Sequence, residues 1–175
     1  MNCELLISLG LAVAGMAAMV LAGGVPASVS ALVYNLRPRW RWLWSAWLAA
    51  VAVTLLVGMT VTCDSRTGAA GAALGVGWLM TVCLVGVATM PLTTVWKQQW
   101  HNILGISAGL LSQAVVLLVN AWWLLVWWLM IPLMAGSMAA LSEREEQCKV
   151  ADGKGVLLAE LLCAMSLYGC LLTKL

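Results

Sequence analysis

The sequence contains very few charged residues. Asp, Glu, Lys and Arg make up only 9% of its 175 residues, whereas 63% are hydrophobic. A water-soluble domain carries about 25% charged residues, because charges coat its surface. The composition therefore argues against a soluble domain and predicts an integral membrane protein surrounded by lipid. The net charge of +2 also gives no reason to expect a nucleic-acid partner.

The sequence also lacks the usual motifs of metal, redox and hydrolytic sites. It has one histidine, and its six cysteines form no CxxC pair, which argues against a zinc ribbon or a thioredoxin-like site. No Ser-His-Asp arrangement, phosphate-binding loop or HExxH motif occurs either. We therefore expect neither a metal nor a cofactor, and the residues favour a protein that is not an enzyme.

Long apolar runs alternate with short charged or Gly- and Pro-containing stretches. Because ~20 apolar residues in a helix cross the ~30 Å bilayer core, these runs predict an all-α, single-domain bundle of about six transmembrane helices with short loops. The predicted spans are about 5–22, 43–61, 69–90, 103–119, 123–141 and 156–172. The first run follows Glu4 rather than basic residues, so we expect a retained helix and not a cleaved signal peptide. The boundary between spans four and five depends on a turn at Asn120.

Basic residues fall mainly on one side of this arrangement. The loops after spans one, three and five contain Arg37, Arg39, Arg41, Lys97, Arg144, Lys149 and Lys154, and the other side has Arg66 and Lys174. Because basic loops stay in the cytoplasm, we expect both termini on the outer side of a bacterial inner (cytoplasmic) membrane. Trp residues near the span ends fit both interfaces: Trp40, Trp42, Trp96 and Trp100 at one, Trp122 and Trp123 at the other. The three arginines between residues 37 and 41 are also expected to attract anionic lipid headgroups.

Small residues recur at every fourth position in three spans. The sets are Gly10, Ala14, Ala18 and Ala22 in the first span, Gly71 and Gly75 with Ala73 and Gly77 in the third, and Gly105 and Gly109 in the fourth. Positions four apart share a helix face, and small residues let membrane helices approach closely. We expect spans one, three and four to pack together. The same faces are candidates for homo-oligomer formation or for binding a partner helix.

Glu160 is the most informative polar residue, because it lies about one turn inside the last predicted span. A carboxylate inside a membrane costs at least ~2.5 kcal/mol, so it needs a partner, water or a proton. One interpretation is a proton-coupled or cation-binding group that faces a cavity. The other is a glutamate near the interface that reaches water and is stabilised by the N-terminal dipole of its own helix. Its shallow position slightly favours the second interpretation.

Five further residues complete the candidate set. Histidine suits proton exchange near neutral pH, but the position of His101 before span four favours a water-exposed interfacial side chain. Gln113 lies deeper, on the Gly105–Gly109 face, and predicts an interhelical hydrogen bond or, as a second interpretation, a cavity wall. The remaining candidates lie on the cytoplasmic side and are Tyr34, Asn35 and Arg37.

Three cysteines fall at the outer end of the predicted spans. They are Cys3, Cys63 and Cys170. A disulfide between two of them would be stable in an oxidising compartment, whereas burial as small hydrophobic residues is the commoner role of membrane cysteines.

Together these residues favour a membrane protein with a polar, cytoplasm-facing cavity that binds or transports a small solute, a proton or a lipid. Glu160 would carry the charge, His101 would be a proton partner at the mouth, and Gln113 would orient the solute. The first alternative is a non-catalytic subunit, anchor or accessory protein that packs against partner helices. The second is a lipid-modifying enzyme that uses Glu160 and His101, which is weaker because two polar residues from different helices make a poor catalytic site.

Overall fold

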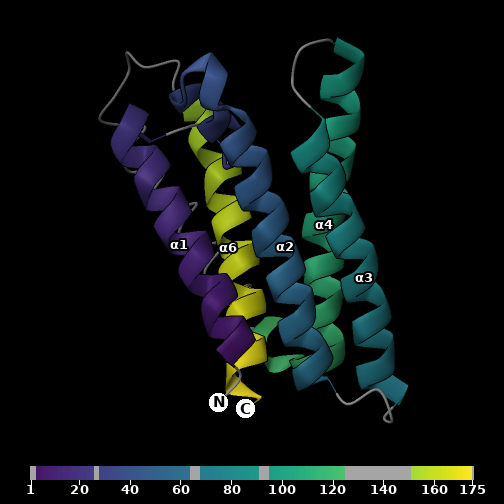
Figure 1. Ribbon diagram of the computed structural model, residues 1–175. Helices are drawn as coiled ribbons and strands as arrows, with labels where there is room; N and C mark the ends of the chain where they lie inside the picture. Colours follow the sequence, from purple (N-terminus) through teal and green to yellow (C-terminus); the bar gives the residue numbers. More distant parts are fainter. Residues whose placement is uncertain (1–2, 26–27, 64–67, 91–94, 125–150, 175) are drawn as a thin grey trace.

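Long helices make up nearly all of the part of the chain that the structure describes. The computed structural model describes residues 3–25, 28–63, 68–90, 95–124 and 151–174. Its elements are α1 (Cys3–Gly23), η1 (Ser30–Asn35), η2 (Pro38–Trp40), α2 (Trp42–Thr62), α3 (Gly68–Thr89), α4 (Val95–Asn120) and α6 (Ala151–Thr173). The five α-helices lie side by side (Figure 1), and the described residues contain no strand. The prediction of an all-α bundle is therefore confirmed.

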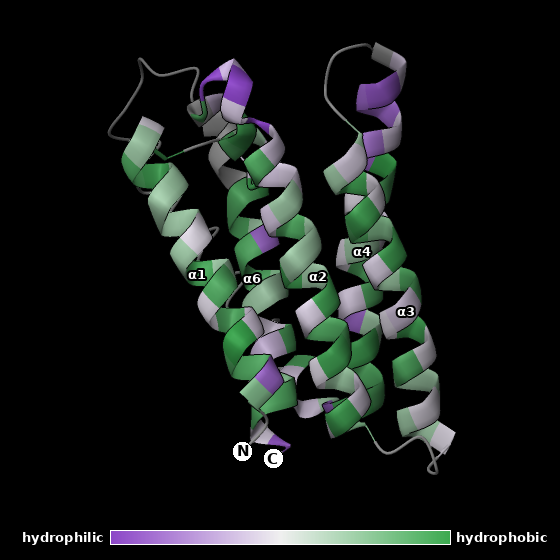
Figure 2. Cartoon of the chain, in the orientation of Figure 1, coloured by the Kyte–Doolittle hydropathy of each residue, from purple (hydrophilic) through white to green (hydrophobic). Residues whose placement is uncertain are grey.

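All five helices are long and apolar enough to cross a membrane. The candidate spans are Cys3–Gly23, Pro38–Thr62, Gly68–Thr89, Trp96–Asn120 and Val156–Thr173. Hydrophobic residues cover most of their length (Figure 2), and large apolar side chains such as Leu21 and Leu110 point outward. Such a surface is suited to contact with lipid, so the chain is a multi-pass membrane protein. The predicted fifth span, 123–141, lies outside the described residues except for its first two positions.

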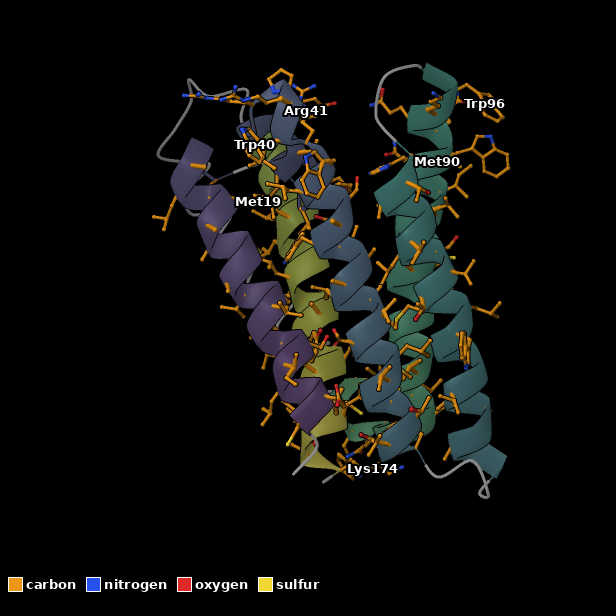
Figure 3. All side chains as sticks on the ribbon, in the orientation of Figure 1. Met19, Trp40, Arg41, Met90, Trp96 and Lys174 are labelled. Atoms are coloured by element: carbon orange, nitrogen blue, oxygen red, sulfur yellow. The ribbon has the colours of Figure 1, made fainter. Side chains whose placement is uncertain are left out.

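The two ends of the bundle differ in charge. Both termini lie at one end, here called the terminal end, together with Lys174 (Figure 3). The opposite, basic end carries Arg37, Arg39, Arg41 and Lys97. Trp40 and Trp96 are exposed at the basic end, as predicted for interfacial tryptophans. The structure thus separates most of the described basic residues from the termini, as the sequence predicts.

Helix α4 ends and helix α6 begins at opposite ends of the bundle. The indole Nε1 of Trp123, just after α4, donates a hydrogen bond of 3.0 Å to Oγ1 of Thr173, the last residue of α6. Helix α6 begins at Ala151, at the basic end (Figure 1).

The order of helix packing differs from the expectation. The most extensive contact is between α3 and α4, and α1 packs mainly against α2 and η1. The expected packing of span three against span four is confirmed, and the expected packing of span one against these two is wrong. The reason is that the small residues of α1 face outward: Gly10, Ala14, Ala18 and Ala22 are all exposed.

Close helix contacts use a small residue opposite a large one instead. A Cβ atom on Gly15 would overlap the indole of Trp47, and one on Gly77 would overlap the side chain of Met59. Two clusters of buried side chains result. The terminal-end core includes Leu5, Leu55, Met59, Met80, Val115 and Leu171, and the basic-end core includes Met19, Leu32, Trp44, Leu48, Val87 and Ala88.

We predict that Gly15→Ala destabilises the bundle and that Gly10→Ala, on the same helix, does not. The new methyl group at position 15 would displace Trp47, and overpacking of this kind costs about 1–3 kcal/mol. Nothing lies within 4 Å of a Cβ atom at position 10. Thermal unfolding of the two variants in detergent measures the difference. Equal midpoints would contradict the contact between Gly15 and Trp47.

Candidate functional site

A cavity of about 290 Å³ lies between the two cores. All five long helices and the residues that lead into η1 contribute to its walls. Most of the lining is apolar, from side chains such as Leu9, Met16, Leu55, Leu84 and Leu161. Polar atoms come from a small set of lining residues, which are Ser30, Ser112, Glu160, Cys163 and Tyr168. The cavity is therefore an apolar space with a few placed polar groups, the usual character of a small-molecule site.

The glycines of α4 provide room for this cavity. Gly105 and Gly109 both line it, and nothing lies within 4 Å of a Cβ atom built on Gly105. At Gly109 the nearest atom to such a Cβ is Sγ of Cys163, at 3.9 Å. The expectation that these glycines bring helices into close contact is thus wrong at Gly105, where the missing side chain leaves empty space.

Glu160 lies on the cavity wall in the third turn of α6. Its Oε2 accepts a hydrogen bond of 2.5 Å from the backbone N–H of Val29. Within the described ranges no other hydrogen bond or ion pair reaches this carboxylate, so Oε1 has no partner there. Stabilisation by the α6 dipole is not the explanation, because α6 begins at Ala151 and the dipole acts within the first turn.

His101 is buried in the basic-end half of the bundle, with 3% of its surface exposed. Its Nε2 lies 2.8 Å from Oγ of Ser30, and its Nδ1 lies 3.2 Å from the carbonyl oxygen of Met90. A carbonyl can only accept, so in the neutral ring Nδ1 carries the proton and Nε2 accepts from the Ser30 hydroxyl. The expectation of a water-exposed histidine is therefore wrong, because Ser30 and Trp44, whose ring stacks at a centroid distance of 6.3 Å, cover this side chain.

Two consecutive residues, Val29 and Ser30, connect three helices at the basic end. The N–H of Val29 binds Glu160 of α6, and its carbonyl accepts a hydrogen bond of 3.2 Å from Nε1 of Trp44 in α2. Ser30 binds His101 of α4. Glu160 and His101, which are far apart in sequence, are thus held through adjacent residues, although only Glu160 lines the cavity.

A second polar connection, which sequence reasoning missed, lies at the terminal-end side of the cavity. Oγ of Ser8 donates to the carbonyl of Val51 at 3.1 Å and lies 2.6 Å from the hydroxyl of Tyr168, which therefore donates to Ser8. These bonds join α1, α2 and α6. A hydroxyl in the apolar run of α1 was the available signal, because such a group needs a partner in lipid. Its partner lies 160 positions away and could not be identified from spacing.

The remaining candidates do not line the cavity. Nε2 of Gln113 donates to Oγ of Ser166 at 3.0 Å, which is the kind of interhelical bond that its position predicts. Tyr34 and Arg37 are exposed at the basic end, where the guanidinium of Arg41 lies 5.4 Å from the centre of the Tyr34 ring. The side chain of Asn35 lies outside the described residues.

The cysteines at the terminal end are thiols. Cys3, Cys63 and Cys170 form no disulfide, and Cys63 and Cys170 are buried. Burial raises the pKa of the Cys63 thiol, and the nearby Lys174 ammonium acts in the opposite direction. In the described part of the chain, no three His, Cys, Asp or Glu side chains are grouped as metal ligands would be.

In comparisons with known proteins, no protein-family model, no curated protein and no solved structure matches this chain.

We predict that Tyr168→Phe destabilises the bundle, whereas Tyr34→Phe has little effect. The first change removes a buried hydrogen bond between α1 and α6, worth about 1 kcal/mol. Tyr34 is exposed, so its hydroxyl can be solvated without a protein partner. The midpoints of thermal unfolding measure both effects. A larger loss in Tyr34→Phe would be inconsistent with the described contacts.

Proposed function

We propose that this protein binds a small, mainly apolar molecule inside the membrane and holds its polar end at Glu160. The supporting observation is the apolar cavity with one carboxylate oxygen open on its wall. Its volume of about 290 Å³ is at the lower limit of ligand sites, which span roughly 300–1,000 Å³. A complete phospholipid is too large for this space, and a small solute fits it.

The position of Glu160 on the cavity wall favours a ligand that is polar at one end. An intramembrane carboxylate costs at least ~2.5 kcal/mol relative to water, and one backbone N–H offsets only part of that cost. A solute that donates a hydrogen bond or brings a positive charge to Oε1 would offset more of it. The part of this cost that the Val29 hydrogen bond does not offset would favour binding of such a solute, whether the protein retains the solute or carries it across the membrane.

The other polar candidates act in this proposal by positioning groups on the cavity wall. His101 fixes the hydroxyl of Ser30, and Gln113 donates to Oγ of Ser112 at 3.2 Å. Ser30 and Ser112 both line the cavity. The enzyme alternative loses support, because His101 is buried and does not line the space that holds Glu160.

The charge distribution supports an orientation. The basic end carries Arg37, Arg39, Arg41 and Lys97, and we assign it to the cytoplasmic side of a bacterial inner membrane. Glu160 lies nearer to this end than to the terminal end. In this orientation the three arginines are exposed where anionic lipid headgroups would be in reach.

The expected consequence is that Gly105→Leu prevents binding and Gly75→Leu does not. Both glycines are exposed and have nothing within 4 Å of a Cβ atom, but only Gly105 lines the cavity, so we expect only a Leu side chain at position 105 to reduce its space. The measurement is thermal stabilisation of the purified protein by a library of small amphipathic compounds. Compounds that stabilise the wild type should stabilise Gly75→Leu equally and Gly105→Leu by no measurable amount. Equal stabilisation of both variants would place binding elsewhere.

A second candidate function, a subunit that packs against partner helices, is supported by the outward-facing small residues of α1. Gly10, Ala14, Ala18 and Ala22 form an exposed stripe along this helix, and such stripes permit close helix association. If the stripe is an interface, Ala14→Leu should abolish an oligomer that is seen in mild detergent by light scattering. Val13→Leu, beside the stripe, is the control. A monomeric wild-type protein would contradict self-association.

A further inference from the structure

We propose that the molecule held in this cavity is a small lipophilic cation, an amine or a quaternary ammonium, whose charged group contacts Oε1 of Glu160. The inference rests on the proposed function, since it names the chemical class of the ligand for the same cavity. It further assigns the apolar part of that ligand to the side of the cavity that opens between α1 and α6.

Charge is the first argument for a cation. Among the cavity-lining residues that the structure describes, Glu160 is the only Asp, Glu, Lys or Arg. Its contact with Val29 supplies a hydrogen bond but no counter-charge. A neutral donor would leave the carboxylate uncompensated in an apolar space, and an anion would be repelled. A cation supplies both the contact and the opposite charge.

Two tryptophans provide the second argument. Trp44 and Trp47 both line the cavity, and each indole N–H already donates to a backbone carbonyl, Val29 at 3.2 Å and Leu11 at 2.8 Å. What the two side chains offer a ligand is therefore aromatic carbon. Aromatic rings attract ammonium groups, and most strongly where water is excluded. The indole of Trp44 and the carboxylate of Glu160 are both hydrogen-bonded to the backbone of Val29, so one residue of the cavity wall connects them.

The shape of the cavity provides the third argument. Val13 of α1 and Met165 of α6 line it, yet they are 54% and 65% exposed, so among the described residues the cavity reaches the outer surface between these helices. Both residues lie near the middle of their spans. Glu160 precedes Met165 by five positions, or about 7.5 Å along the helix axis. A bound amphiphile thus has its cation toward the basic end and its apolar part toward the lipid.

The test uses two probes of the same shape that differ in charge. Benzyltrimethylammonium carries a permanent positive charge, and neopentylbenzene has carbon in place of the nitrogen. Both are added to the wild-type protein and to Glu160→Gln, with Glu4→Gln as a matched control at the terminal end, and thermal stabilisation gives each affinity. We expect the wild type and Glu4→Gln to bind the cation at least about tenfold more tightly than its neutral isostere. Glu160→Gln should lose this preference and still bind neopentylbenzene.

The outcomes separate the two proposals. Equal affinity for both probes in the wild type, or a preference for the cation that persists in Glu160→Gln, overturns the ligand class and leaves a cavity that binds apolar molecules. Stabilisation by neither probe overturns the proposed function together with the ligand class. The Gly105→Leu variant assigns any observed binding to the cavity, because it should bind neither probe.

A second measurement needs no change at Glu160. The thiol of Cys163 lines the same cavity, and methanethiosulfonate reagents that carry a trimethylammonium or a sulfonate group label thiols. The mass of the peptide that contains Cys163 reports its labelling in the wild-type protein. We expect the ratio of cationic to anionic labelling rates to be higher at Cys163 than at a thiol in solution. A ratio equal to or below that of the free thiol would contradict selection for cations.

Discussion

The structure depends on the constraint that hydrocarbon offers no hydrogen bonds, so polar groups inside the membrane must find partners within the protein. The described helices meet this constraint by pairing polar groups between elements. Ser8 binds Tyr168, Gln113 binds Ser166, Trp47 binds a carbonyl of α1, and His101 binds Ser30. The hydrophobic effect does not bring these helices together, because lipid is as apolar as their surfaces. These polar pairs thus help to determine which faces of α1, α2, α4 and α6 meet, together with the contacts between small and large residues. Oε1 of Glu160 is the exception, because it has no hydrogen-bond partner among the described residues. It therefore gives the apolar cavity a polar atom that a ligand could contact.

Much of the fold could be predicted from the sequence. Spans one to four and six, the shared end of the two termini and the separation of basic residues follow from hydropathy and charge, which are local properties. Which face of each helix points inward does not follow from these local properties. All-apolar helices have almost no polar side to orient them, so the stripe of Gly10, Ala14, Ala18 and Ala22 was assigned inward although it faces outward. In a soluble protein, the same error would have been visible as an exposed apolar face.

The candidate site was predictable only in part, for a related reason. The cost of burying charge singled out Glu160, and that residue does line the cavity. The burial of His101 could not be predicted, because Ser30, which covers it, lies 71 positions earlier in the chain. The role of Tyr168 could not be predicted either, because its partner Ser8 lies 160 positions away in the chain. Glycine spacing likewise does not distinguish Gly77, which contacts Met59, from Gly105, which leaves space.

The opening between Val13 and Met165 determines which ligand concentration controls the occupancy of the cavity. An opening at mid-membrane depth exchanges molecules with the acyl chains, so the bilayer is the solvent from which a ligand is taken up. The relevant concentration is then the one in the hydrocarbon, which is the aqueous concentration multiplied by a partition coefficient. Two compounds with equal intrinsic affinity would occupy the protein to different extents if they dissolve differently in lipid. Lipid composition, through packing and thickness, would shift occupancy without any change in the protein.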